Sequence, residues 1–200
     1  MKITVIGATG MIGQRVVAEA VSRGHQVVAG SRSGASVGGA QGLAIDLQDT
    51  RAVAEQMAAS DATVVSVSPP RDGSSHEPTI ASHRALIEAQ PAGRLLVVGG
   101  AGSLRAGDRE LRQTEGFPLE YKPEADTFAA VLDLYRNSSG LDWTLLCPAP
   151  EIAPGTRTGS YATELDVPAG ERISAEDFAV ALVDEVERPA HRQARFTVAN

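Results

Sequence analysis

The sequence contains a single cysteine, two lysines and few aromatic residues among its 200 positions. One cysteine excludes a disulfide framework, and no group of His, Cys and carboxylate residues has the spacing of a metal site. Cys147 stands in an apolar run, so we expect a buried, unreactive thiol. No stretch approaches the roughly 20 apolar residues of a membrane-spanning helix, and no signal peptide precedes the first apolar run. We therefore expect a cytoplasmic protein without a metal.

Positive charge is also scarce, because 25 acidic residues outnumber 18 basic ones and give a net charge of -7. The basic residues are scattered singly, which argues against a nucleic-acid partner or an anionic membrane surface. Hydrophobic residues make up 42% of the chain and charged residues 22%, values ordinary for a globular protein. We expect one domain over residues 1–200, either monomeric or homodimeric.

Apolar runs of strand length alternate with segments of helical period along the whole chain, a pattern typical of a parallel sheet covered by helices on both faces. The expected strands are residues 2–6, 26–29, 43–45, 63–67, 95–98, 144–146 and 195–198. The expected helices are residues 11–23, 49–59, 77–89, 125–138 and 175–187. In the fourth helix, Tyr135 belongs to the apolar face, and we expect its hydroxyl at the rim.

Two segments, residues 100–122 and 148–173, fit neither pattern and follow strands. In an open α/β sheet, ligands bind outside the carboxyl ends of the strands. We therefore expect these segments to form a small substrate-side lobe.

A glycine-rich turn joins the first strand to the first helix, with the sequence Gly7-Ala8-Thr9-Gly10-Met11-Ile12-Gly13. Gly7 would permit a tight turn, Gly10 a close approach of phosphate to the backbone, and Gly13 close packing of the helix. Thr9 adds a hydroxyl, and Met11 and Ile12 open the helix, whose N-terminus attracts anions. This pattern predicts a Rossmann-type, doubly wound parallel sheet that binds a dinucleotide. The alternative is a purely structural tight turn.

The second strand ends at Ser31, followed by Arg32, where a protein that binds NAD usually has an acidic residue for the ribose 2′-hydroxyl. An arginine flanked by hydroxyl groups suits the 2′-phosphate of NADPH. We therefore predict NADPH in preference to NADH, the alternative being that Arg32 is a solvated loop residue. After the third strand, Asp46 and Leu47 face the expected adenine site, although Asp46 could instead cap the next helix.

Several motifs together resemble the NAD(P)H-binding, NmrA-like group of atypical short-chain dehydrogenases, which includes small flavin and biliverdin reductases. They are the glycine turn, Val97–Leu104, Asp142-Trp143-Thr144 leading to Pro148, Gly155–Gly159 and Arg172–Ala179. The resemblance implies strand order 3-2-1-4-5-6, with Ser66, Val67 and Pro148 near the cofactor.

The sequence departs from carbonyl-reducing members of that superfamily, because it lacks the Tyr-x-x-x-Lys motif through which lysine lowers the pKa of a proton-donating tyrosine. Tyr121 and Lys122 are adjacent and would point in different directions on a helix or strand. The candidate catalytic groups are Ser103, Tyr121 and Lys122, with His76 as a further pocket candidate. For each of them a packing or surface role is the alternative.

Two functions fit these features. The first is an NADPH-dependent reductase that transfers hydride to a small conjugated acceptor such as a flavin, a quinone or a carbonyl compound. The second is a non-catalytic NADP(H) sensor that acts through a protein partner, which the missing motif favours. A nucleotide-sugar epimerase is disfavoured, because the chain is too short for a sizeable substrate domain.

Overall fold

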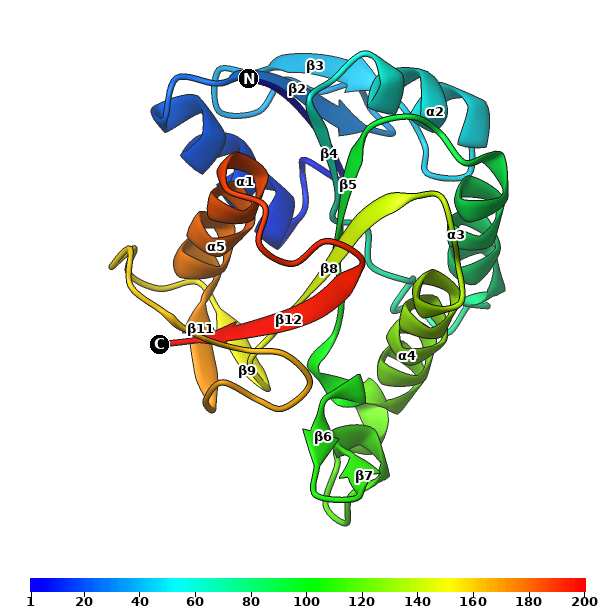
Figure 1. Ribbon diagram of the computed structural model, residues 1–200, viewed down its shortest axis with the longest axis vertical. Helices are drawn as coiled ribbons and strands as arrows, with labels where there is room; N and C mark the ends of the chain where they lie inside the picture. The colour runs from blue at the N-terminus through cyan, green and yellow to red at the C-terminus, as the bar shows by residue number, and fades with distance from the viewer.

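An eight-stranded sheet forms the centre of the computed structural model, which describes all 200 residues (Figure 1). Its order is β10-β12-β8-β5-β4-β1-β2-β3, and only β10 runs antiparallel to its neighbour. The strands are β1 (Lys2–Ile6), β2 (Gln26–Ser31), β3 (Gln41–Ala44), β4 (Ala62–Val65), β5 (Arg94–Val98), β8 (Asp142–Pro148), β10 (Ala162–Glu164) and β12 (Ala194–Ala199). The predicted order of the first six parallel strands is confirmed, and β12 adds a seventh beside β8.

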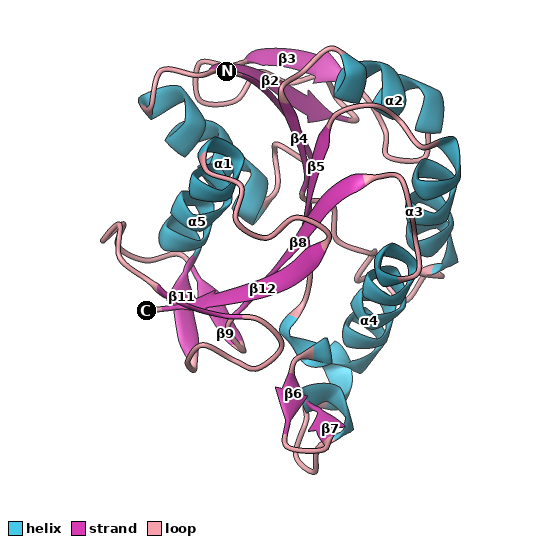
Figure 2. Ribbon diagram, in the orientation of Figure 1, coloured by secondary structure: helices cyan, strands magenta, loops and turns pink.

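Helices cover both faces of the sheet, so the prediction of a doubly wound α/β fold is confirmed (Figure 2). On one face lie α1 (Met11–Ser22) and α5 (Ala175–Glu187), and on the other α2 (Thr50–Ala58), α3 (Glu77–Ala89) and α4 (Lys122–Arg136). Each face buries its own apolar cluster, of 24 and 17 residues. The fourth helix begins three residues earlier than predicted, because Pro123 lies in its first turn, where proline costs no hydrogen bond. No helix has the length and apolar character to cross a membrane.

The two segments that matched no regular pattern contain several short elements. Residues 100–122 hold the hairpin β6 (Arg105–Ala106) and β7 (Arg109–Glu110) and the 3₁₀ turns η1 (Ala101–Ser103), η2 (Leu111–Gln113) and η3 (Leu119–Tyr121). Residues 148–173 contain β10 and most of a small parallel pair, β9 (Glu151–Ala153) and β11 (Arg172–Ser174). Elements of two or three residues are too short for a detectable period, so the sequence does not reveal them.

The position expected for the Tyr135 hydroxyl is wrong, because this side chain is fully buried between α4 and α3. Its hydroxyl lies 2.9 Å from Nδ1 of His83, which is also buried. Burial lowers the pKa of His83 to about 4, so the imidazole is neutral near pH 7. Its Nδ1 can then accept a hydrogen bond from the Tyr135 hydroxyl. Cys147 is buried as predicted, and burial raises its pKa to about 11, which keeps the thiol unreactive.

Candidate functional site

A cleft of about 550 Å³ opens beside the glycine turn, at the carboxyl ends of the first strands. Nine of the residues predicted to bind the cofactor line this cleft: Gly7, Thr9, Gly10, Ser31, Arg32, Asp46, Leu47, Ser66 and Val67. They come from the ends of four different strands, β1 to β4, and from the loops that follow them. The parallel order of these strands brings the four loops to the same edge of the sheet, where Rossmann folds bind ligands.

The three glycines of the turn have different surroundings. Gly7 has a positive φ of 87°, and a Cβ added there would lie 2.1 Å from the carbonyl oxygen of Ser66. A Cβ on Gly13 would lie 2.1 Å from the carbonyl oxygen of Gly7, so the helix packs directly on the turn. At Gly10 the nearest atom would be 3.3 Å away. Gly7 and Gly13 are thus required by the fold, whereas a Cβ at Gly10 needs only a small shift and Gly10 lines the cleft.

The start of α1 is left open by the protein. No side chain caps α1, as is also the case for α3 and α4, whereas Asp49 and Ser174 cap α2 and α5 by accepting hydrogen bonds from backbone amides. The amide of Gln14 makes the first intrahelical bond, 3.0 Å to the carbonyl of Gly10, and the first turn holds no acidic residue. The amides of Met11, Ile12 and Gly13 therefore have no intrahelical acceptor and can bind an anion. This arrangement fits a pyrophosphate.

Arg32 lies exposed at the edge of the cleft, with no carboxylate within 4 Å. Most arginines of this acidic chain are paired, and the four that are not are Arg32, Arg105, Arg109 and Arg172. The hydroxyls of Ser31 and Ser33 lie 3.3 Å apart on either side of it in sequence. The cleft is thus lined by one uncompensated guanidinium and by the hydroxyl of Ser31, groups that can donate to a phosphate.

Asp46 does not cap the helix that follows it, because Asp49 does so by accepting from the amide of Ala52 at 3.0 Å. One carboxylate oxygen of Asp46 accepts from the amide of Gln48 at 3.0 Å. Asp46 lines the cleft, and the second oxygen has no partner within the protein.

The loop between β4 and α3 forms a wall of the cleft that the sequence analysis missed. It contributes Ser68, Pro70, Ser74 and Ser75, and the first turn of α3 adds Pro78 and Thr79. The sequence signal for this wall is a Ser-, Pro- and Gly-rich segment directly after a strand.

His76 holds this loop in place and is not directed at the cleft. Its Nε2 lies 2.9 Å from the carbonyl oxygen of Pro70, and its Nδ1 lies 2.7 Å from the hydroxyl of Thr127 on α4. Arg71 ties the same loop to α4 through two hydrogen bonds to Glu124. His76 therefore acts as a positioning residue for the wall of the cleft.

The three candidate catalytic residues do not lie in the cleft, and the structure does not bring them together. Ser103 is buried, and its hydroxyl accepts from Arg195 at 3.0 Å. Lys122 donates to the carbonyl of Arg112 at 3.3 Å, and Tyr121 is 58% exposed at the start of α4. Met11, Ile12, Gly13 and Pro148 also lie outside the cleft lining. We assign no catalytic role to Ser103, Tyr121 or Lys122.

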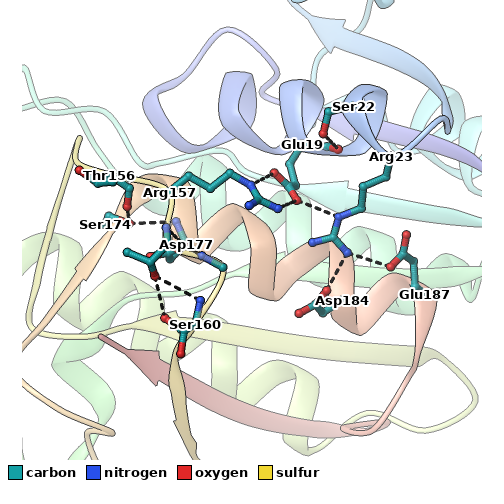
Figure 3. Close-up of polar contacts among 12 residues, drawn as sticks. Glu19, Ser22, Arg23, Thr156, Arg157, Ser160, Ser174, Asp177, Asp184 and Glu187 are labelled. Carbon is teal, nitrogen blue, oxygen red and sulfur yellow. Dashed lines mark hydrogen bonds and ion pairs between the residues drawn. The ribbon is translucent and has the colours of Figure 1, made fainter.

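The segment 148–173 is held against α1 and α5 and does not line the cleft (Figure 3). Arg157 donates two hydrogen bonds to Glu19 of α1, at 2.7 and 2.8 Å, and thereby lowers the pKa of that carboxyl. The amides of Thr158 and Gly159 donate to the buried carboxylate of Asp177, at 2.9 and 2.7 Å. These contacts pin the segment on the helical face, so it forms no wall of the cleft.

The family model described as NAD(P)H-binding matches residues 7–189, from the glycine turn to the end of the last helix. The chain belongs to the NAD(P)H-binding family. A curated relative, the uncharacterized protein YwnB of Bacillus subtilis strain 168, is 38% identical over 99% of this chain and 98% of its own length. The family assignment confirms the predicted resemblance, with a reductase-like fold and a nicotinamide cofactor.

Solved structures similar to this NAD(P)H-binding protein carry several names. A Burkholderia pseudomallei protein provisionally called exported is 37% identical, with complete coverage of both chains and a TM-score of 0.88. A Streptococcus pneumoniae protein provisionally called an NADH-flavin reductase is 33% identical, covers 100% of this chain and 99% of its own, and has a TM-score of 0.85. The anaerobilin reductase ChuY of Escherichia coli, 19% identical over 99% and 96% of the chains with a TM-score of 0.78, shares the fold.

Proposed function

We propose that this protein is an NADPH-dependent reductase of a small conjugated acceptor, with a flavin or quinone preferred to a carbonyl compound. The observation that carries the proposal is the cleft, which is lined both by the glycine turn that leads into the uncapped helix α1 and by the unpaired Arg32. Bound NADPH would supply a hydride, and the protein would bind and orient both reactants. The cytoplasmic location and the choice between monomer and homodimer remain predictions.

Each part of the cleft would contact a different part of the cofactor. The amides that begin α1, beside Gly10, would hold the pyrophosphate. Arg32 and Ser31 would hold the 2′-phosphate through charge-assisted hydrogen bonds. Leu47, Val67 and the free carboxylate oxygen of Asp46 would contact the adenosine.

The preference for a flavin or quinone follows from the missing proton donor. No Tyr-x-x-x-Lys motif is present, and Ser103, Tyr121 and Lys122 lie outside the cleft. A flavin or quinone can accept hydride and take its proton from water, whereas a carbonyl gains more from a positioned acid. The name of the Streptococcus pneumoniae relative, an NADH-flavin reductase, supports the same acceptor class.

Steady-state assays of NADPH oxidation test the proposal, with flavin mononucleotide, a soluble quinone and a simple carbonyl compound as acceptors. We expect many turnovers with the flavin or the quinone and few or none with the carbonyl. Tight NADPH binding without turnover on any of the three would contradict the reductase proposal. It would favour the non-catalytic sensor, which the missing proton-donor motif also fits.

Arg32→Glu is expected to weaken NADPH binding by about 100-fold, because it removes charge-assisted hydrogen bonds and places a repelling charge beside the 2′-phosphate. NADH, which lacks that phosphate, should lose no more than about threefold. Arg172→Glu is the matched control, because Arg172 is likewise exposed and unpaired but lies outside the cleft. Dissociation constants for both cofactors provide the measurement, and equal weakening of the two would remove Arg32 from the 2′-phosphate site.

A further inference from the structure

A second cavity, of about 310 Å³, shares no lining residue with the cleft. It lies among the β6–β7 hairpin, which projects at the bottom of Figure 1, the last turn of α4 and the start of β12. None of its ten lining residues is hydrophobic. We call this cavity the arginine pocket, because five of its lining residues are arginines: Arg105, Arg109, Arg112, Arg136 and Arg195. Both segments predicted to form a substrate-side lobe meet here, since Asp166 also lines the cavity.

The arginine pocket carries more positive charge than its own carboxylates can neutralise. The lining holds three carboxylates, those of Asp108, Glu110 and Asp166, against five guanidinium groups. Arg105 and Arg109 have no carboxylate within 4 Å, although the whole chain has a net charge of -7. Asp126, outside the lining, also pairs with Arg112 at 2.6 Å, so the five guanidiniums face four carboxylates. The charge that an anionic ligand would compensate is that of the two unpaired arginines, Arg105 and Arg109.

The inner wall of the cavity is fixed by hydrogen bonds. The Arg195 side chain is 1% exposed, and its Nη1 donates to the carbonyl and hydroxyl oxygens of Ser103 at 2.9 and 3.0 Å. The same guanidinium pairs with Asp166, which also accepts from Arg136 at 2.6 Å. The backbone amide of Arg105 donates to the carbonyl of Asp166 at 2.8 Å. This wall is preorganised, so a ligand need not order it.

The outer side of the cavity provides free donors. Arg105 and Arg109 are exposed on the hairpin, and no hydrogen bond from Arg109 to the protein is formed. Arg112 is engaged through Nε with Glu110 and through Nη1 with Asp126, which leaves Nη2 unused. Several guanidiniums around this cavity thus have N–H groups without a partner. Such groups can donate to phosphate oxygens, and one guanidinium can bind two oxygens of the same phosphate.

We propose that the arginine pocket binds the phosphate monoester dianion of a small molecule. The two unpaired guanidiniums, those of Arg105 and Arg109, can both donate to the oxygens of a dianion, and the cavity volume accommodates a phosphate with a small organic group. The polar lining offers no surface for a large apolar ligand. This site is separate from the proposed cofactor cleft and does not depend on dinucleotide binding there.

Calorimetric titration of the full-length protein with inorganic phosphate and phenyl phosphate, in a phosphate-free buffer of low ionic strength, tests the proposal. We expect saturable binding of both probes and a loss of about tenfold or more in the Arg105→Gln/Arg109→Gln variant. Both side chains are exposed and unpaired, so this variant should keep the wild-type melting temperature. Arg172→Gln, at the unpaired arginine outside both cavities, should bind the probes as the wild type does.

A further variant separates this pocket from the cleft, which would also attract phosphate. Arg32→Gln should retain phosphate binding at the arginine pocket. Binding lost in Arg32→Gln and kept in the double variant would place the phosphate in the cleft and overturn the proposal. Absence of saturable binding to the wild type, or equal weakening by Arg172→Gln, would overturn it as well.

Discussion

Replacement of Gly10 by valine is expected to abolish binding of NADPH and NADH while leaving the fold intact. The two effects can be separated, because a Cβ at Gly10 would lie 3.3 Å from the carbonyl oxygen of Gly7, a tight contact that a shift of a few tenths of an ångström relieves. The valine side chain would occupy the space where a pyrophosphate approaches the start of α1. We expect an affinity loss of about 100-fold or more, since a displaced pyrophosphate loses several charge-assisted hydrogen bonds.

Two variants control for the effect of Gly10→Val. Ala18→Val places the same side chain at an exposed position of α1 outside the cleft and should bind both cofactors normally. Gly13→Val should disrupt the fold, because its Cβ would overlap the carbonyl of Gly7. Circular dichroism and dissociation constants provide the readouts. Wild-type affinity in Gly10→Val would exclude the glycine turn from the binding site.

Loss of the Glu185 carboxylate should lower the stability of the protein strongly without unfolding it. This side chain is 4% exposed and accepts from Arg94 at 2.8 Å, and from the backbone amide and ring Nδ1 of His191 at 2.9 and 2.8 Å. Arg94 is 6% exposed, and burial already lowers its pKa. Glu185→Ala would leave the buried guanidinium with one carboxylate, the partly exposed Asp142 at 3.0 Å, and we expect it to reduce the free energy of unfolding by about 3 kcal/mol.

Urea unfolding provides the measurement, and the melting temperature should fall by about 10 °C for a chain of this length. The control is Glu55→Ala, which removes an exposed partner of Arg51 and should cost less than about 0.5 kcal/mol. Arg94 and Asp142 begin β5 and β8, at the edge of the sheet away from the cleft. Glu185→Ala should therefore bind the cofactor normally at low temperature. A stability change no larger than that of Glu55→Ala would show that the buried pair adds little.

The sheet and its helices could be predicted from the sequence because the chain repeats one local pattern. Each buried parallel strand is an apolar run and each helix has an apolar face, so α3 and α5 were placed at their observed bounds. The glycine turn was also predictable from local sequence. Gly7 and Gly13 have no space for a side chain, so the fold requires glycine at the spacing that the motif shows. Whether Arg32 has an acidic partner depends on where the fold places every carboxylate. The positions of residues along the sequence could not predict that it has none.

The two long loops do not line the cleft, and their positions depend on contacts far apart in sequence. Arg157 reaches Glu19 and Arg195 reaches Ser103, over separations of 138 and 92 residues. Such pairs leave no periodic signal, so the sequence could not show that these loops lie away from the cleft. The contact between Arg195 and Ser103 also forms the inner wall of the arginine pocket, which no motif predicted.

Parallel calorimetric titrations of the purified protein with NADPH and NADH test the central claim most directly. We predict saturable binding at one site per chain, with NADPH the tighter ligand because Arg32 can compensate its 2′-phosphate. Failure of both dinucleotides to bind would contradict the assignment of the cleft beside Gly10.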